Sequence, residues 1–504
     1  MMPASTDRVR NKKQAENQKE LLERLIRLRN RVDRDGRARF ETWRPWIRRR
    51  QFLCSGINLA HYLALREHDL RELQLELSPL GLSSLGRLES KVIPALDSVI
   101  ASLARICDYP DQANYSHPPC RAMLRGERIL QKRSEAVLGT ASNISQTRIM
   151  VTLPAESASD ADMVVNLLRK GMDVARINCA HDNETVWMQM VENIRDASRK
   201  TGRSCRIMMD LAGPKARLLN VTLPEGPGRV FCGDRIVLGR KEEPSKSNRF
   251  AAVCSIPEVL DSLRSGAEVW IDDGKIGTVV ETVSDERAVL LVKQTGPKGA
   301  KLAADKGLNF PGTELNISPL SETDLLNIDF ITTHADIIGY SFIQTPDDLG
   351  TLENALALRV DNPSRIPIVA KIETALAVHN LPDIIVRAAG RHPFAVMIAR
   401  GDLAVEIGFE RLAEIQEEIL WLTEAAHVPV IWATQVLERL VKKGVRSRAE
   451  ITDAAMSVRA ECVMLNKGPY ILDAIDIIND LYNRMHQHQA KKTPRLRALK
   501  SWTC

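Results

Sequence analysis

Six short apolar runs between residues 174 and 434 each end in polar or charged residues. One run ends in Lys371-Ile372-Glu373, and in an extended strand this alternation puts Lys371 and Glu373 on the same face. The other five end at Arg176–His181, Asp210–Arg217, Ser341, Arg400–Asp402 and Thr434. Isolated buried charges are costly unless they are paired or bind a metal. The pattern therefore predicts a site for an anion and a metal ion.

The residue types suggest how that site would divide its work. Glu373 and Asp402 offer the hard carboxylate oxygens that Mg²⁺ prefers. Arg176, Arg217 and Lys371 would form a cationic clamp for phosphate oxygens. Each pair also has a plainer interpretation: Lys371 and Glu373 as a structural ion pair, and Arg400 and Asp402 as a pair across a tight turn. The convergence of six such run ends favours a shared site.

The elements that must position these residues alternate regularly after residue 145. Short runs rich in β-branched residues alternate with amphipathic stretches of helical length. Eight strands alternating with helices predict a closed parallel (β/α)8 TIM barrel, in the α/β class, whose strands end at one functional rim. The eight runs are Arg148–Leu153, Val174–Asn178, Arg206–Asp210, Ile337–Phe342, Ile366–Ile372, Phe394–Ala399, Val428–Ala433 and Cys462–Leu465.

Two further regions flank or interrupt the predicted barrel, which covers residues 145–213 and 312–490. Residues 214–311 carry strand patterns only and predict an inserted β-barrel lid domain. Residues 1–144 predict a helical extension with a frayed, polar start at 1–20 and a connector near 108–120. Residues 491–504 form a basic tail.

Composition narrows the function classes. Hydrophobic residues make up 44% and charged residues 27%, as in ordinary globular proteins, and no apolar run is long enough to span a membrane. Nine dispersed cysteines fit reduced thiols and a cytoplasmic location. Residues 1–50 hold 16 Lys and Arg against 7 Asp and Glu, so the net charge of +6 belongs to this segment. We expect a solvated or barrel-packing face there, and no nucleic-acid partner, because acidic residues interrupt the basic ones and aromatic residues make up 4%.

The order of the motifs resembles the pyruvate kinase family over about residues 146–485. The motifs that carry the resemblance are Asp173–Asn178, Gly213–Arg217, Lys306–Gly312, Val369–Glu373, Ile398–Leu403, Ala433–Gln435 and Ser447–Glu450. The resemblance implies transfer of a phosphoryl group from phosphoenolpyruvate to ADP, giving pyruvate and ATP, with Mg²⁺ or Mn²⁺ as cofactor. It also implies a cytoplasmic homo-oligomer.

The resemblance assigns roles residue by residue. Lys371, Thr434, Arg176 and Arg217 match catalytic residues, with Lys371 steadying the phosphoryl group and the enolate. The substrate contacts would come from Arg176, Lys371, Gly401, Asp402, Thr434 and Ser341. The nucleotide contacts would come from Asn178, His181, Arg217 and the lid residue Lys306. Glu373 and Asp402 match the metal ligands.

This sequence departs from the common family pattern at the monovalent-cation site. Ala180 and Leu211 replace a serine and a threonine, and Lys215 replaces a glutamate. Lys215 can supply the positive charge that K⁺ would otherwise bring, so we expect activity without K⁺. The plainer interpretation of Lys215 is a solvated loop charge.

Two other departures keep alternatives open. Asn466-Lys-Gly-Pro469 replaces the family's Ser-Gly-Glu-Thr after the eighth strand, and no counterpart of the C-terminal regulatory domain follows about residue 490. These changes admit a weakly catalytic or non-catalytic binding and regulatory protein. A metal-dependent aldolase or lyase acting on pyruvate enolate is a second alternative, because Lys371–Asn380 and Gly401–Leu403 also resemble that class. The inserted lid favours the kinase.

Overall fold

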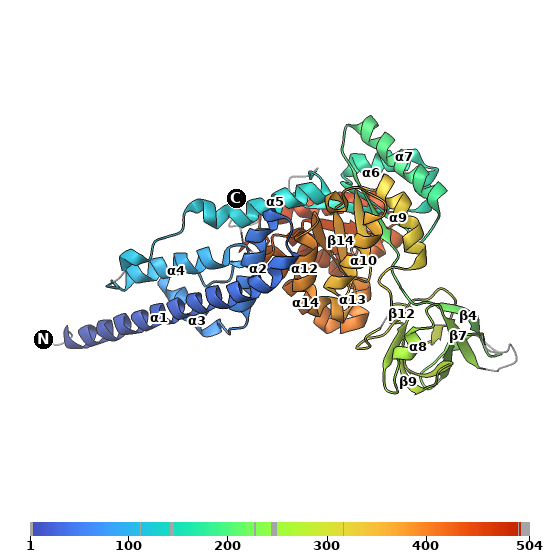
Figure 1. The fold of residues 1–504 in the computed structure, drawn as a ribbon, viewed down its shortest axis with the longest axis horizontal. Coiled ribbons are helices and arrows are strands. Elements are labelled where there is room, and N and C mark those ends of the chain that lie inside the picture. The colour runs from blue at the N-terminus through green and yellow to red at the C-terminus, as the bar shows by residue number, and fades with distance from the viewer. Residues whose placement is uncertain are drawn as a thin grey trace.

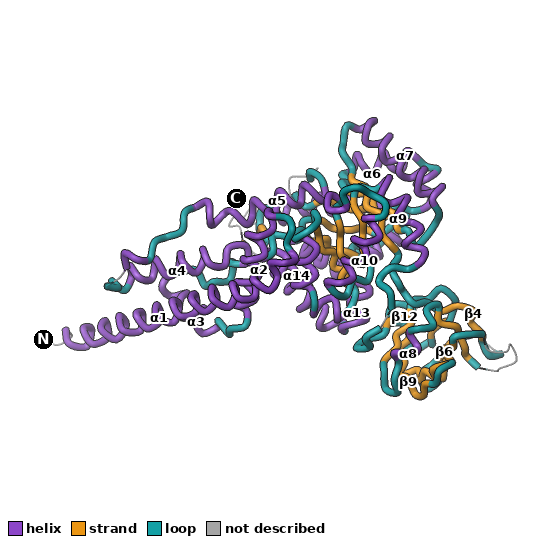
Figure 2. The backbone as a smooth tube through the Cα atoms, in the orientation of Figure 1, coloured by secondary structure: helices purple, strands orange, loops and turns teal. Residues whose placement is uncertain are grey.

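The computed structural model describes residues 4–110, 112–141, 146–225, 228–242, 249–315, 317–491 and 493–494. A central barrel lies between an elongated helical region at the N-terminus and a β-rich region on the opposite side (Figure 1). In Figure 2 the strands form two groups, one encircled by helices and one almost free of them. No helix in the described ranges combines the length and the apolar composition needed to cross a bilayer.

The eight predicted strands form a closed barrel in the order β1-β17-β16-β15-β14-β13-β3-β2, and all neighbouring pairs are parallel. The predicted (β/α)8 fold is confirmed, and each strand lies within two residues of the predicted run. The strands are β1 Arg148–Thr152, β2 Val174–Asn178, β3 Arg206–Leu211, β13 Ile337–Tyr340, β14 Ile368–Ile372, β15 Phe394–Ala399, β16 Val430–Ala433 and β17 Cys462–Leu465.

Helices cover the outside of the barrel and connect its strands. Several begin with side-chain caps; Thr345, for example, caps α10 in a reciprocal box with Asp348. The helices are α6 Ala161–Lys170, α7 Glu184–Thr201, α9 Glu322–His334, α10 Pro346–Ala357, α11 Ala375–His379, α12 Leu381–Ala389, α13 Arg400–Ile407, α14 Phe409–Ala425, α15 Glu438–Lys443, α16 Arg448–Met456 and α17 Ile471–Met485.

The insertion folds around a hydrophobic core of its own. Its main sheet has the order β12-β8-β9-β10-β6-β7-β4, and an isolated bridge between Arg217 and Gly307 joins the flanks of the two edge strands. The expectation of strands alone was wrong in one detail, because a helical turn, α8 Val259–Ser262, buries Val259 and Leu260. The strands are β4 Leu218–Thr222, β5 Arg229–Val230, β6 Arg235–Gly239, β7 Phe250–Cys254, β8 Glu268–Ile271, β9 Ile276–Val283, β10 Arg287–Gln294, β11 Ala300–Lys301 and β12 Leu308–Asn309.

The N-terminal region is helical, as predicted, but its first helix begins at Ala4 rather than after a frayed segment of 20 residues. The packing of Leu21, Leu22 and Leu25 into the core anchors this long helix, which extends beyond the contact. The helices here are α1 Ala4–Trp43, α2 Leu53–Arg66, α3 Arg71–Leu77, α4 Val92–Ile106 and α5 Cys120–Leu138.

Helix α5 connects this region to the barrel interior. Val137 and Leu138, at its C-terminal end, pack in one cluster with Val174, Ile337 and Ile431, which point into the barrel. Other buried residues of the helical region and the barrel share one continuous core. The predicted boundary at 144/145 lies within residues 142–145, outside the described ranges, and the domain limits stay predictions. The basic tail, residues 491–504, also stays a prediction. Residues 492 and 495–504 of it are not described, and near its start β19 Thr493–Pro494 pairs with β18 Gln489–Ala490.

Candidate functional site

A cluster of four charged side chains lies where β2, β3 and β14 end; Arg176, Asp210 and Glu373 are buried, and the Lys371 side chain is 12% exposed. Lys371 Nζ is 3.0 Å from Glu373 Oε1 and 3.6 Å from Asp210 Oδ2. Arg176 donates from both Nε and Nη2 to Asp210 Oδ2, at 2.9 and 2.6 Å, and from Nη1 to Thr152 Oγ1. Two cations and two carboxylates therefore meet at the carboxyl end of the barrel, where (β/α)8 enzymes place their active sites.

The alternation of β14 explains why its charges point inward. Ile368, Ala370 and Ile372 pack outward against the helices, whereas Val369 belongs to the interior cluster. Lys371 and Glu373 follow Val369 at intervals of two residues, so their side chains lie on the same inward face of the strand, closer to the rim. On β13, Gly339 leaves room for this arrangement, because a Cβ there would lie 2.2 Å from Asp210 Oδ1.

The turn after β13 supports the cluster from a second side. Phe342 has a left-handed backbone, with φ of 54°, and its amide donates to Glu373 Oε2 at 2.6 Å. Ser341 Oγ accepts from Lys371 Nζ at 2.9 Å and donates to the Leu211 carbonyl at 2.6 Å. Such a backbone in a non-glycine residue is costly and is typical of functional sites.

Electrostatics keep Lys371 charged in this site. Burial opposes its charge, but the carboxylates of Glu373 and Asp210 outweigh burial and raise the pKa of Lys371. Burial also opposes ionisation of Asp210, yet Arg176 and Lys371 lower the pKa of that carboxyl group. Burial and the negative charge of Asp402 raise the pKa of Glu373, although Lys371 and the Phe342 amide oppose them.

Asp402 lies next to this cluster, in the first turn of α13, and its partner is Lys215. The Lys215 Nζ is 2.5 Å from Asp402 Oδ1, and its side chain is 17% exposed. The interpretation of Lys215 as a solvated loop charge is therefore wrong. The suggested pair between Arg400 and Asp402 is also wrong, because Arg400 Nη1 donates to Asp453 at 2.6 Å and its other nitrogens donate to the carbonyls of Ala433 and Thr434.

Thr434 follows β16 and contacts the first turn of α13. Its φ is 63°, and its Oγ1 accepts from the Gly401 amide at 2.7 Å. The Arg400 bonds to the Ala433 and Thr434 carbonyls hold this turn in place. The structure thus brings Gly401, Asp402 and Thr434 together at the ends of β15 and β16.

Lys306 and Arg217, two residues predicted to contact phosphate, lie in the insertion and bind partners within it. Lys306 Nζ is 3.0 Å from Asp272 Oδ1. Arg217 donates from Nη1 to the Asp305 carbonyl at 3.0 Å. Within the described ranges, neither side chain bonds to the barrel cluster. A contact of Lys306 with a bound nucleotide would require it to leave Asp272.

Asn178 ends β2, and His181 lies in the loop that follows. Asn178 Oδ1 accepts from the Ala180 amide at 3.3 Å, and the His181 carbonyl accepts from Trp187. Burial lowers the pKa of His181, and the positive charges of Lys467 and Arg217 lower it further. The unusual loop after β17 therefore brings an additional cation, Lys467, into electrostatic range of this side of the rim.

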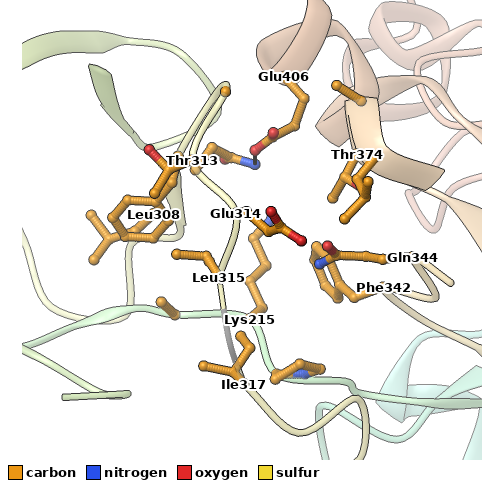
Figure 3. Close-up of a pocket in the computed structure, with 17 residues that line it drawn as sticks. Lys215, Leu308, Thr313, Glu314, Leu315, Ile317, Phe342, Gln344, Thr374 and Glu406 are labelled. Atoms are coloured by element: carbon orange, nitrogen blue, oxygen red, sulfur yellow. Dashed lines mark hydrogen bonds between the residues drawn. The ribbon is translucent and has the colours of Figure 1, made fainter. Parts of the chain in front are cut away.

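A cavity of about 220 Å³ separates the insertion from the barrel (Figure 3). Lys215 and Glu314 point into it from one side and Phe342 and Gln344 from the other. Glu406, on the same face of α13 as Asp402, accepts from Asn309 of β12 at 3.2 Å. Burial raises the pKa of Glu406 to about 7. This contact links α13 directly to the insertion.

The donor set fits a divalent cation. Glu373 and Asp402 supply hard oxygens, and the negative charge of Asp402 adds to burial in raising the pKa of Glu373. In this structure the ammonium groups of Lys371 and Lys215 neutralise the two carboxylates. No cluster of three or more His, Cys, Asp or Glu side chains with metal-binding geometry occurs in the described ranges. The assignment of a two-carboxylate metal site stays a prediction.

Residues 144–474, more than half of the chain, match the family described as pyruvate kinase, barrel domain. The chain belongs to the pyruvate kinase family. It is 31% identical to the pyruvate kinase of Dictyostelium discoideum over 345 residues, which cover 67% of this chain and 66% of that protein. It is also 31% identical to the pyruvate kinase of Geobacillus stearothermophilus, with coverage of 68% and 57%.

A solved structure agrees with the family assignment. The crystal structure of a pyruvate kinase from Cryptosporidium parvum superposes with a TM-score of 0.60 at 26% identity, covering 70% of this chain and 72% of that one. The resemblance inferred from the motifs is thereby confirmed. The chain matches somewhat less than two thirds of the length of the curated relatives named above.

Sequence reasoning missed three residues that shape the site. Asp210 was noted at a strand end, but it is the anion that holds both Arg176 and Lys371. Glu406 follows Asp402 by four residues, a spacing that puts both on one helix face and could have drawn attention to it. Asp324 accepts from the amides of Ala212 and Gly213, and the Ser321-x-x-Asp324 capping box marks it in the sequence.

Proposed function

We propose that this chain transfers the phosphoryl group of phosphoenolpyruvate to ADP, giving pyruvate and ATP. The observation that carries the proposal is the largely buried Lys371, held charged by Glu373 and Asp210 beside Arg176 at the barrel rim. Phosphoryl transfer depends mainly on positioning and on neutralising spread negative charge. Membership of the pyruvate kinase family supports the same reaction.

In this proposal the role of each rim residue follows from its position. Lys371 and Arg176 neutralise the phosphoryl group while its bond to the enol oxygen breaks and a bond to the terminal oxygen of ADP forms. Lys371 then stabilises the enolate oxygen, and Thr434 lies beside the carbon that gains a proton. The Gly401 amide would leave Thr434 Oγ1, its acceptor in this structure, and donate with the Asp402 amide to the substrate carboxylate, with Ser341 supporting Lys371. Asn178, His181, Arg217 and Lys306 would contact the nucleotide.

Glu373 and Asp402 would hold Mg²⁺ or Mn²⁺. Such an ion supplies positive charge that neutralises the phosphoryl oxygens. Binding it requires Lys215 to release Asp402 or to share it, since Nζ now lies 2.5 Å from the carboxylate. Lys215 then remains as a fixed positive charge near the phosphates, which is why we propose activity without K⁺.

A coupled assay with phosphoenolpyruvate, ADP and Mg²⁺ tests the proposal. The wild-type chain should turn over, and Lys371→Met should lower kcat by about a thousandfold, because it removes a buried cation aimed at developing charge. Lys442→Met, a surface lysine paired within its own helix, is the matched control and should leave kcat unchanged. Equal activity of wild type and Lys371→Met would contradict the proposal.

The second candidate is a non-catalytic or weakly catalytic pyruvate kinase-like protein that binds the substrate. The replaced loop Asn466–Pro469 favours it, because Lys467 adds a cation where the family carries a glutamate and hydroxyl groups. Mg²⁺-dependent binding of phosphoenolpyruvate with no turnover would select this candidate. The aldolase or lyase alternative predicts cleavage of 4-hydroxy-2-oxo acids, and the inserted β sheet argues against it.

We further propose a cytoplasmic homo-oligomer. The described cysteines all carry free thiols, as expected in a reducing compartment. Leu326 on α9 and Leu358 after α10 are 72% and 85% exposed, on helices that lie side by side. Arg359, which follows Leu358, donates to the carbonyl of Leu325, which precedes Leu326, so the two leucines lie near each other. Contiguous exposed apolar surface marks protein–protein contacts.

A further inference from the structure

A cavity of about 630 Å³ lies in the helical region, away from the barrel rim. It is bounded by α2, by α5, by the 3-10 turn Glu89–Lys91 with the start of α4, and by His427 before β16. His427 precedes β16, whereas Thr434 follows it, so the cavity and the candidate active site lie at opposite ends of that strand. The volume is within the usual range for small-molecule pockets, about 300–1,000 Å³.

The charge around this cavity is of one sign. Five cations line it, Lys91, Arg121, Arg125, Arg128 and Lys132, and no aspartate or glutamate is among its lining residues. Four of the five lie on α5 at spacings of four, three and four residues, which puts them on one helix face. Like charges at these spacings destabilise a helix, so this face is costly without an anion.

The described part of the chain offers these cations little compensation. Lys91 Nζ is 3.7 Å from Glu127 Oε1, whose side chain is 61% exposed. No carboxylate within the described ranges lies at ion-pair distance from Arg121, Arg125, Arg128 or Lys132. Three guanidinium groups and the Lys132 ammonium group are therefore available to a ligand, and Lys91 could join them by leaving the exposed Glu127.

At the base of the cavity, the polar side chains of His427 and Asn58 already have hydrogen-bond partners within the protein. His427 bonds through Nδ1 to Ser55 Oγ and through Nε2 to the Ser90 carbonyl, both at 2.9 Å. Asn58 donates to the carbonyls of Glu89 and Ala425 and accepts from the Val92 amide. Gly126 lets α5 approach closely, since a Cβ there would lie 2.3 Å from the Ser90 carbonyl oxygen. The cations are thus presented from a fixed frame.

We propose that this cavity binds a small metabolite carrying two or more phosphate groups. Five positive charges match about four negative ones, which two phosphate monoesters supply near neutral pH. A guanidinium group can donate two parallel hydrogen bonds to two oxygens of one phosphate. Ile57, Ile93 and Ile129 offer apolar walls for the carbon skeleton of the ligand. No phenylalanine, tyrosine or tryptophan is among the residues that line the cavity, so it lacks the large stacking surfaces that single-stranded nucleic acids require.

The test uses inorganic pyrophosphate as the probe, with inorganic phosphate as the single-phosphate comparison. Binding to the full chain is measured by calorimetry in the Lys371→Met background, which weakens phosphate binding at the barrel rim. Arg121→Gln, Arg125→Gln and Arg128→Gln together should weaken pyrophosphate binding by at least about tenfold. Arg27→Gln, Arg31→Gln and Arg34→Gln, three charges removed from the exposed face of α1, form the matched control and should leave the Kd unchanged.

A second variant separates shape from charge. Ala122→Trp keeps every cation but fills part of the cavity, and it should also weaken pyrophosphate binding while the thermal unfolding midpoint is retained. Phosphate should bind more weakly than pyrophosphate. Equal affinities in the cavity variant and the control variant would overturn the proposal, as would the absence of saturable pyrophosphate binding at millimolar concentration. Competition by a short single-stranded oligonucleotide alone would overturn it in favour of a nucleic-acid surface.

Discussion

At the scale of single residues, the site is a network in which each buried charge has a named partner. Asp210 holds two cations, Arg176 and Lys371, and is itself fully buried. Lys371 in turn contacts Glu373 and Ser341. Removing one member of such a network leaves the others buried without compensation, which costs more than the net value of the pair.

Asp210→Asn tests this network. We expect it to lower the free energy of unfolding by about 3 to 5 kcal/mol, because two cations lose their shared counter-charge in a buried site. Urea unfolding followed by circular dichroism measures the change. Asp196→Asn, which removes an exposed pair with Arg199, is the control and should cost less than about 1 kcal/mol. Equal effects of the two substitutions would show that Asp210 does not carry the cluster.

We propose that Lys215 removes the requirement for K⁺. If its ammonium group replaces K⁺, wild-type activity should be the same in potassium and in tetramethylammonium buffers. Lys215→Glu should lower activity in the absence of K⁺ by at least about tenfold and make it respond to added K⁺, because a positive charge near the phosphates is lost. Lys301→Glu, which changes an exposed lysine of the insertion, is the control. A wild-type enzyme that needs K⁺ would refute this role.

At the scale of elements, close helix approaches depend on glycine. Gly36 of α1 faces α2, and a Cβ there would lie 2.4 Å from the His61 ring and 3.0 Å from its backbone. Two long helices can therefore cross tightly in the N-terminal region, where α1 and α2 make their main contact. The glycines of α1 and α5 are packing residues, although glycine is a poor helix former in isolation.

Gly36→Ala should accordingly destabilise the protein. We expect a loss of about 1 to 3 kcal/mol, because the His61 backbone must move to admit a methyl group. Gly350→Ala is the matched control: it lies in α10, its Cβ would meet nothing closer than 3.8 Å, and it should be neutral or stabilising by up to about 1 kcal/mol. Thermal unfolding of both variants measures the difference, and a stabilising Gly36→Ala would contradict the packing argument.

At the scale of the whole molecule, the helical region and the barrel are joined by polar as well as apolar contacts. Trp43 Nε1 donates to Asp383 at 2.7 Å, and the amides of Arg48 and Arg49 donate to the Gly390 carbonyl. Arg133 donates to the carbonyls of Ala426 and His427. Since the two regions share one core, we expect them to unfold together, whereas the insertion has a separate core.

His427, at this junction, should make stability depend on pH. Burial lowers its pKa to about 4, and the nearby Arg133 and Arg125 act in the same direction. The unfolded chain therefore binds the proton first as pH falls. The contribution of the neutral His427 to the free energy of unfolding is fully present above pH 6.5 and is lost as the pH falls to about 4. It amounts to about 3 kcal/mol.

His427→Gln should reduce this acid sensitivity. The difference in unfolding free energy between pH 7 and pH 4.5 should be smaller in the variant than in the wild type by about 2 kcal/mol. His61, whose pKa burial also lowers to about 4, remains in both proteins and cancels in the comparison. His379→Gln, at an exposed position, should match the wild type. An unchanged pH dependence in His427→Gln would exclude this histidine as the cause.

The sequence by itself determined the barrel, its eight strands and the residues at the strand ends. It could do so because β-strand alternation and the connection of parallel strands by helices are local patterns, and because Lys371 and Glu373 share a strand face wherever that strand lies. The family motifs, such as Val369–Glu373, are likewise contiguous. The inserted sheet could be predicted from its strand pattern, but its helical turn at Val259–Ser262 could not.

Only the tertiary structure decided which charges meet. Arg400 pairs with Asp453 and Lys215 with Asp402, across 53 and 187 residues. No local pattern encodes these choices, because they follow from how neighbouring strands and the insertion are placed. The same holds for Leu138 of α5, which packs inside the barrel, and for the basic face of α5, which becomes a cavity wall only when α2 and His427 lie opposite it.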